Sequence, residues 1–218
     1  MLVYCADANF QEAKYHGWRV RITFGLKAHS GWAVLVGICE GDAGLVVTDR
    51  HRMELADLAG GEWARQPYHA AEGLTPARAR KVVEDGIAIA QRLAVSEMKA
   101  ALTRAKIGGH TVAGCAVLTG TPMAAWSVEE ILAVHVRMHM AEGALYRDVL
   151  IHAARTCKLP CLQVREKQVL DEAVRALRKP GPALVRTVSG LKSQAGAPWG
   201  KDQKDASLAA MIAMAGKT

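Results

Sequence analysis

The chain has 218 residues, of which 50% are hydrophobic and 22% charged, and its 28 Lys and Arg against 21 Asp and Glu give a formal net charge of +7. This composition excludes a wholly disordered chain, and the length suits one ordinary domain that buries roughly 70% of its unfolded surface. The charge permits attraction to nucleic acid or another polyanion without requiring it, because the basic residues are spread along the chain.

The sequence gives no indication of a membrane or of export. Uncharged apolar runs such as Gly31–Cys39 are far shorter than the ~20 residues of a membrane span, and Met1–Phe10 lacks the apolar core of a leader. The five cysteines are odd in number, and the close pair Cys157 and Cys161 has no second pair with which to bind zinc. We therefore expect a cytoplasmic protein with reduced thiols and without a cofactor.

The first part of the chain predicts three antiparallel strands in succession. Residues 1–18 show no clear period and are interpreted as an N-terminal extension. Strand patterns follow at Arg19–Phe24, Trp32–Ile38, Leu45–Thr48 and Arg50–Leu55. The turn-like stretch Gly25–Gly31 leaves two interpretations open, one long strand or a strand and its hairpin partner. A loop is expected over Ala59–Gly73.

The period then changes to that of helices. Thr75 and Pro76 begin a long amphipathic helix to about Lys106, because apolar residues recur at three- and four-residue steps. Ser127 and Glu130 form a capping box that opens a second long helix, ending near Cys157. Short strands are expected at Thr111–Leu118 and Cys161–Val164, and further helices at Lys167–Leu177 and Lys201–Ala215.

This order of elements predicts the fold class. Two β-α crossovers after the three strands place the later strands parallel to the first. We predict an α/β fold, a ribonuclease-H-like mixed sheet of three antiparallel strands and two parallel crossover strands, flanked by helices. It would form a single domain over residues 19–218, with a connecting insertion at about 166–198.

Three segments carry a resemblance to a known family. Phe24–Val34 reads Phe-Gly-Leu-Lys-Ala-His-Ser-Gly-Trp-Ala-Val, Lys201–Ala210 places two aspartates three residues apart before an Ala-rich helix, and Glu142–Val164 joins an Ala-rich helix through Leu-Pro to a strand. Together they resemble RuvC-type Holliday-junction resolvases. An uncharacterised bacterial family that shares Lys-Ala-His-Ser-Gly-Trp-Ala is a closer resemblance.

The resemblance implies a carboxylate site in which this chain departs from the pattern. The family has an Asp on the first strand where this chain has Lys27, and an acid at the end of the fourth strand, where Val117–Gly120 has none. Asp202 and Asp205 remain at the place of the last acidic pair, although acids in the first turn of a helix also favour its dipole. An ammonium repels Mg²⁺, so we expect no two-metal cleavage and an ion pair between Lys27 and Asp202 or Asp205.

A second group of polar residues lies on the helix after Ser127. His135, His139 and Glu142 are spaced four and three apart and share one face, directed toward the interior or a cleft. Three interpretations stay open: hydrogen-bonded structural residues, a binding or acid–base site, and a metal site. We expect His139 and Glu142 to form a hydrogen-bonded pair.

The remaining candidates are single residues. His29 is expected in the cleft beside Lys27, and His69 on a long loop that reaches over the sheet edge. Trp199 is either a packing anchor or a stacking platform, and Lys204 is a candidate binding residue on the last helix.

Two functions from different classes follow. The first is a resolvase-like module without a complete carboxylate site that binds nucleic acid or a protein partner. The second is an enzyme of other chemistry that uses Lys27, His29, His139, Glu142, Asp202 and Asp205 as candidate catalytic residues. A plain interaction domain or a homodimer is a third interpretation.

Overall fold

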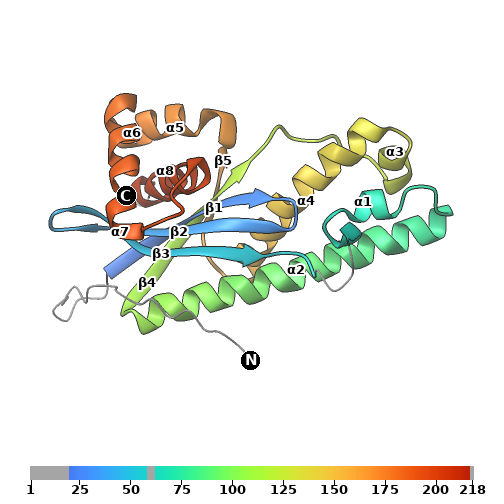
Figure 1. Ribbon diagram of the computed structural model, residues 1–218, viewed down its shortest axis with the longest axis horizontal. Coiled ribbons are helices and arrows are strands. Elements are labelled where there is room, and N and C mark those ends of the chain that lie inside the picture. Colours follow the sequence, from blue (N-terminus) through green and yellow to red (C-terminus); the bar gives the residue numbers. More distant parts are fainter. Residues whose placement is uncertain (1–19, 58–61, 217–218) are drawn as a thin grey trace.

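A five-stranded mixed sheet forms the centre of the molecule (Figure 1). The computed structural model describes residues 20–57 and 62–216, so the expected extension over residues 1–18 lies outside the described residues. The strands are β1 (Val20–His29), β2 (Trp32–Gly41), β3 (Gly44–Glu54), β4 (His110–Thr119) and β5 (Cys161–Arg165). Their order is β3-β2-β1-β4-β5, with β1–β2 and β2–β3 antiparallel and β1–β4 and β4–β5 parallel. The predicted ribonuclease-H-like sheet is confirmed.

Helices cover both faces of this sheet (Figure 1). One face packs against α2 (Pro76–Ile107) and α4 (His135–Thr156), with the short helices α1 (Pro67–Ala70) and α3 (Val128–Leu132) beside them. The opposite face packs against α8 (Lys201–Ala215), α5 (Val169–Leu177) and α6 (Gly181–Gly190), with α7 (Lys192–Ala195) nearby. The remaining short elements are the 3₁₀ turns η2 (Glu62–Arg65) and η3 (Glu166–Gln168). The expected connecting insertion is therefore mostly helical.

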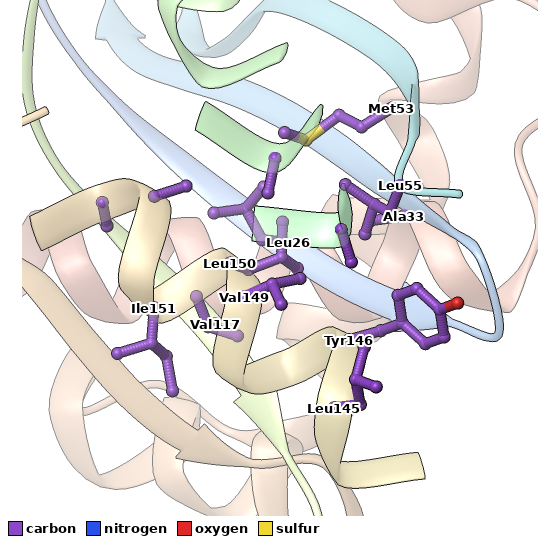
Figure 2. Packing of buried hydrophobic residues seen from close by; sticks show 14 of the residues in the cluster. Leu26, Ala33, Met53, Leu55, Val117, Leu145, Tyr146, Val149, Leu150 and Ile151 are labelled. Atoms are coloured by element: carbon purple, nitrogen blue, oxygen red, sulfur yellow. The ribbon is translucent and has the colours of Figure 1, made fainter. Parts of the chain in front are cut away.

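The two faces of β1 have different partners because successive side chains of a strand point to opposite sides. Ile22, Phe24 and Leu26 belong to the core that α2 and α4 cover, and Figure 2 shows Leu26 close to Val149 and Leu150 of α4. The residues between them face α8. Both sides of the strand are buried, as expected for a central strand of a sheet covered on two faces.

Of the two interpretations of Gly25–Gly31, the strand with its hairpin partner is confirmed, but the turn is much shorter than this stretch. β1 continues through this stretch to His29, and only Ser30 and Gly31 turn the chain into β2, with Gly31 at a φ of 83°. Gly25 serves a different purpose, since a Cβ at this position would lie 1.7 Å from the carbonyl oxygen of Ala206 in α8. The glycine thus permits a close approach of the helix backbone to the strand, which is a common reason for glycine in a strand.

The second predicted long helix is divided in two. The Ser127–Glu130 capping box is present, but it opens the short α3, and Val134 adopts an extended conformation before α4 begins at His135. Arg137 donates to the carbonyl oxygen of Glu130 at 2.9 Å and so satisfies one acceptor that the break exposes. The expected loop Ala59–Gly73 likewise contains η2 and α1 in its described part. Among the described residues, no helix combines the length and the apolar character needed to cross a membrane.

The close contact at Gly25 predicts a specific sensitivity to substitution. Gly25→Ala is expected to lower the free energy of unfolding by at least about 3 kcal/mol, because α8 must move away from the sheet. The control is Gly190→Ala at the end of α6, where a Cβ meets no atom within 4 Å. Its stability should be unchanged or raised by up to about 1 kcal/mol. Urea denaturation of both variants measures the difference, and equal effects would contradict the packing.

Candidate functional site

The candidate site begins with the way in which α8 lies along β1. Three alternate residues of β1 meet α8 in turn. The hydroxyl of Thr23 donates to the carbonyl oxygen of Ala210 at 2.9 Å, Gly25 lies against Ala206, and Lys27 reaches the first turns of the helix. This alignment brings the end of β1 to the N-terminal end of α8, where the two aspartates lie.

Lys27 is the centre of an ion-pair cluster. Its side chain is only 6% exposed, and its Nζ lies 2.9 Å from Asp205 Oδ2, 3.0 Å from Asp202 Oδ1 and 3.0 Å from Glu166 Oε1. The predicted ion pair of Lys27 with the aspartates is confirmed. Lys201 also contacts Asp205, from the exposed side of the cluster.

The charges of the cluster stabilise one another. Burial by itself lowers the pKa of Lys27, but the hydrogen bonds to Asp205, Glu166 and Asp202 outweigh it, so the pKa is raised well above its usual value. Burial likewise raises the pKa of Asp202, but the hydrogen bond from Lys27 and the nearby His29 hold it below the usual range. Lys27 and Asp202 are therefore both ionised throughout the neutral pH range.

His29 lies at the edge of the same cluster. Its ring stacks on that of Trp32, with centroids 4.2 Å apart and planes at 11°, and its Nε2 lies 3.1 Å from Asp202 Oδ2. Arg52 lies over the Trp32 ring at 3.9 Å from the centroid. The hairpin turn between β1 and β2 thus fixes the imidazole beside the carboxylate, as expected for a residue of the cleft.

Two cavities open beside Lys27. One of about 290 Å³ is lined by Lys27, Ala28, His29, Ser30, Gly143, Arg147 and Glu166. A neighbouring cavity of about 340 Å³ shares Arg147 and Glu166 with it, and is completed by Thr119, Gly120, Thr121, Pro122, Arg165, Lys167 and Gln168. Both lie at the carboxyl ends of the parallel strands β1, β4 and β5, where ligands of α/β sheets commonly bind.

The carboxylates do not fit the two-metal centre that the resemblance implies. Such a centre needs carboxylates around two divalent ions ~3.5–4 Å apart. Here an ammonium lies within 3.0 Å of all three carboxylates. An ammonium has three N–H donors, which matches the three carboxylate partners, and its positive charge repels a divalent cation from the same space.

The expected pair of His139 and Glu142 is wrong. Glu142, 3% exposed, accepts hydrogen bonds from the backbone N–H groups of Tyr68 at 2.8 Å and His69 at 3.3 Å, and its Oε1 lies 3.4 Å from His69 Nδ1. Burial raises the pKa of this carboxyl group to about 7, although the two backbone hydrogen bonds lower it. The imidazole of His139 instead lies 3.1 Å from that of His135, both on exposed residues.

The expected position of His69 is also wrong. His69 is not on a free loop but on the short helix α1, and its side chain is largely buried against Glu142 of α4. The carboxylate fixes α1 because it accepts from two successive backbone N–H groups at the start of this helix. His69 consequently faces α4 and does not reach over the sheet edge.

Trp199 is a packing residue. It is 8% exposed within the core between α8 and α6, and its Nε1 donates to the carbonyl oxygen of Val188 at 2.7 Å. A ring so enclosed is not a platform on which a base can stack. Lys204 lies half-buried in the first turns of α8 and does not line either cavity.

Sequence reasoning missed Glu166 and Arg147. Glu166 follows β5 directly and supplies the third carboxylate of the cluster, and Arg147 of α4 lines both cavities. The guanidinium of Arg147 lies against Gly120, where a Cβ would come within 2.5 Å of its Nη1. The available signal for Glu166 was its position one residue past a parallel strand adjacent to β4, because such strand ends share one sheet edge.

Comparisons with known proteins give structural similarity without sequence similarity. No family model and no curated protein matches the chain. Among solved structures, Thermus thermophilus RuvC has a TM-score of 0.46 and 12% identity, covering 89% of this chain and 93% of that one. The same organism's RuvC with a Holliday junction has a TM-score of 0.46 and 11% identity, covering 88% and 91%. A yeast mitochondrial Holliday junction resolvase has a TM-score of 0.39 and 12% identity, covering 91% and 81%.

The cluster predicts a pH-dependent effect of Lys27→Met. At pH 7 we expect a loss of roughly 3 kcal/mol, because three carboxylates lose their shared cation. Folding lowers the pKa of Asp202, so its stabilising contribution is present above the unfolded value of about 4 and is lost as the pH falls through the folded value. The difference between wild type and variant should therefore narrow on acidification.

Thermal unfolding between pH 7 and roughly pH 2 measures this effect, because the contribution is lost only below the unfolded value of the carboxyl group. Lys81→Met is the matched control, since Lys81 forms an exposed pair with Asp85 and should contribute less than about 1 kcal/mol. If Lys27→Met had the same cost at both pH values, the carboxylates would not be its partners.

Proposed function

We propose that this chain is a resolvase-like, nucleic-acid-binding module in which an ammonium takes the place of the catalytic cations. The observation that carries the proposal is the contact of Lys27 Nζ with three carboxylates at 2.9–3.0 Å beside two cavities with basic walls. The ion pairs keep the fold of the cleft without metal. The basic residues around it supply the attraction for a polyanion.

The distribution of charge supports binding at the rim and not at the centre. The three carboxylates have only two ammonium partners, Lys27 and Lys201, so the centre keeps a net negative charge and is unfavourable for a phosphate. Arg147, Arg165 and Lys167 line the adjoining cavity at the sheet edge. Phosphate contacts from Arg and Lys dominate the affinity of nucleic-acid-binding proteins and make it salt-dependent.

The proposed basic rim predicts that removal of its side chains weakens DNA binding measurably. Arg165→Ala and Lys167→Ala should each weaken binding to a branched DNA and lower the slope of log K against log salt by about 1, as for one lost phosphate contact. Lys106→Ala is the control. Lys106 is exposed at the end of α2, beside the start of β4, and therefore lies at the opposite end of the strands from the two cavities. Fluorescence anisotropy over a range of salt concentrations gives the slopes. Equal slopes for all three variants would contradict the proposed surface.

The ammonium predicts the absence of metal-dependent cleavage. With Mg²⁺ or Mn²⁺ we expect no cutting of branched DNA or of an RNA–DNA hybrid above background, because Lys27 repels the cations that such a reaction needs. Asp205→Asn serves as the control for contaminating nuclease. Robust cleavage by the wild type that this substitution abolishes would overturn the prediction.

A second candidate function is an enzyme of other chemistry in the same cleft. Its support is His29, whose Nε2 lies 3.1 Å from Asp202 Oδ2 and which lines the cavity of about 290 Å³ together with Ser30. An imidazole beside a carboxylate is a common general base. A small molecule that stabilises the wild type but not His29→Ala, together with no salt-dependent DNA binding, would favour this candidate. A homodimer stays a proposal, which sedimentation tests directly.

A further inference from the structure

Three histidines from two helices converge outside the lysine-centred cluster. His69 comes from α1, and His135 and His139 come from the first two turns of α4. One ring nitrogen of each lies within 4.8 Å of those of the other two. The ring centroids are 5.6 Å apart for His69 and His135, 4.8 Å for His69 and His139, and 4.6 Å for His135 and His139.

The separation of the nitrogens suits a common metal ion. A tetrahedral Zn²⁺ with Zn–N bonds of ~2.0–2.1 Å places two ligand nitrogens ~3.4 Å apart. His135 Nε2 and His139 Nε2 lie 3.1 Å apart, on residues one helical turn apart on one face. The three nitrogens lie within 4.8 Å of one another, so binding of one ion requires the exposed rings of His135 and His139 to turn toward His69. Without an ion, two such nitrogens satisfy each other only if one is protonated and the other is not.

Glu142 orients the third ligand. Its Oε1 lies 3.4 Å from His69 Nδ1 and accepts from the backbone of the same residue, so the Nε2 side of the ring is directed away from the carboxylate. A carboxylate that receives one ring N–H and leaves the other nitrogen for a metal is the usual partner of a metal-binding histidine. Glu142 Oε2 is buried without a hydrogen-bond partner among the described residues, so the contacts of this carboxylate with α1 are all made by Oε1, the oxygen that His69 Nδ1 approaches.

We propose that His69, His135 and His139 bind one divalent transition-metal ion through three imidazole nitrogens, and we take Zn²⁺ as the reference ion. Three imidazoles favour zinc, copper, nickel or iron over Mg²⁺, which prefers oxygen ligands. Since His135 and His139 are exposed, the fourth coordination position opens to solvent, the arrangement of sites that bind a water or a substrate. The ion would join α1 to α4. It would also lie one helical turn from Gly143, which lines the cavity beside Lys27.

Metal binding to the purified full-length protein tests the site. We expect one equivalent of Zn²⁺ by titration calorimetry, and at least 100-fold weaker binding by His135→Ala and by His139→Ala. His152→Ala is the matched control, because His152 is an exposed residue of the same helix that lies beside Thr156 and not in the cluster. Its affinity should equal that of the wild type. Unchanged affinity in His139→Ala, or no binding by the wild type, would overturn the proposal.

Cobalt substitution identifies the ligands. A Co²⁺ complex of the wild type should show the visible absorption of nitrogen and oxygen coordination without a thiolate charge-transfer band, because the site contains no cysteine. A thiolate band would place the ion at a cysteine instead and would contradict the site.

A separate variant tests whether Glu142 positions His69 for metal binding. Glu142→Gln should keep the stoichiometry and the cobalt spectrum while weakening the affinity 10–100-fold, since His69 loses its charged acceptor. An unchanged affinity would remove Glu142 from the account. Failure of these experiments would leave the proposed nucleic-acid binding untouched, because none of them uses nucleic acid.

Discussion

The close approach of α8 to β1 is the contact on which the candidate site depends. Gly25 has no side chain, so the carbonyl oxygen of Ala206 lies where a Cβ would be. Two residues earlier on the strand, the hydroxyl of Thr23 donates a hydrogen bond to the carbonyl oxygen of Ala210. With these two contacts in place, the next residue on that face of the strand, Lys27, must meet the first turn of the helix. The ion pairs with Asp202 and Asp205 follow from the register of packing. A helix displaced by one turn would leave a buried ammonium without its partners, at a cost of several kcal/mol.

The second polar group depends on α4 in a comparable way. Glu142 is buried on the side of α4 that faces α1, and it holds that short helix by accepting from the backbone of Tyr68 and His69. One turn toward the N-terminus, α4 extends past this cover, and His139 and His135 are exposed. One turn toward the C-terminus, Gly143 and then Arg147 line the cavity beside Lys27. A single helix therefore separates a group of three imidazoles from a cavity lined by charged residues, and it positions both.

The sequence predicts those features that depend on periodicity or on residue spacing. The alternation at the start of β1, the buried apolar run of β2 and the start of α2 at Pro76 were recognisable. So were the common face of Asp202 and Asp205 and the burial of Glu142. The partner of Glu142 was not, because α1 is one turn long and has no periodic pattern that would place it against α4. The break at Val134 was hidden for a similar reason: no Pro or Gly marks it. Glu166 required the sheet order as well as the sequence, since its relation to Lys27 exists only when β5 lies beside β4 and β4 beside β1.

The exchange of a metal for an ammonium changes what the centre of such a cleft can do. A divalent ion held by carboxylates keeps open coordination positions, through which it can bind and polarise a phosphate oxygen. An ammonium has only three N–H donors and no coordination sphere to expand. At Lys27 these donors face Asp205, Asp202 and Glu166, so none remains for a substrate. Any anion that enters the cleft must therefore be bound by the residues of its walls, of which Arg147 is the one common to both cavities. The ion-pair cluster then acts on a bound anion only through its fixed charge. Its main role is structural, because it holds β1, β5 and α8 together around the cavity walls that bind the anion.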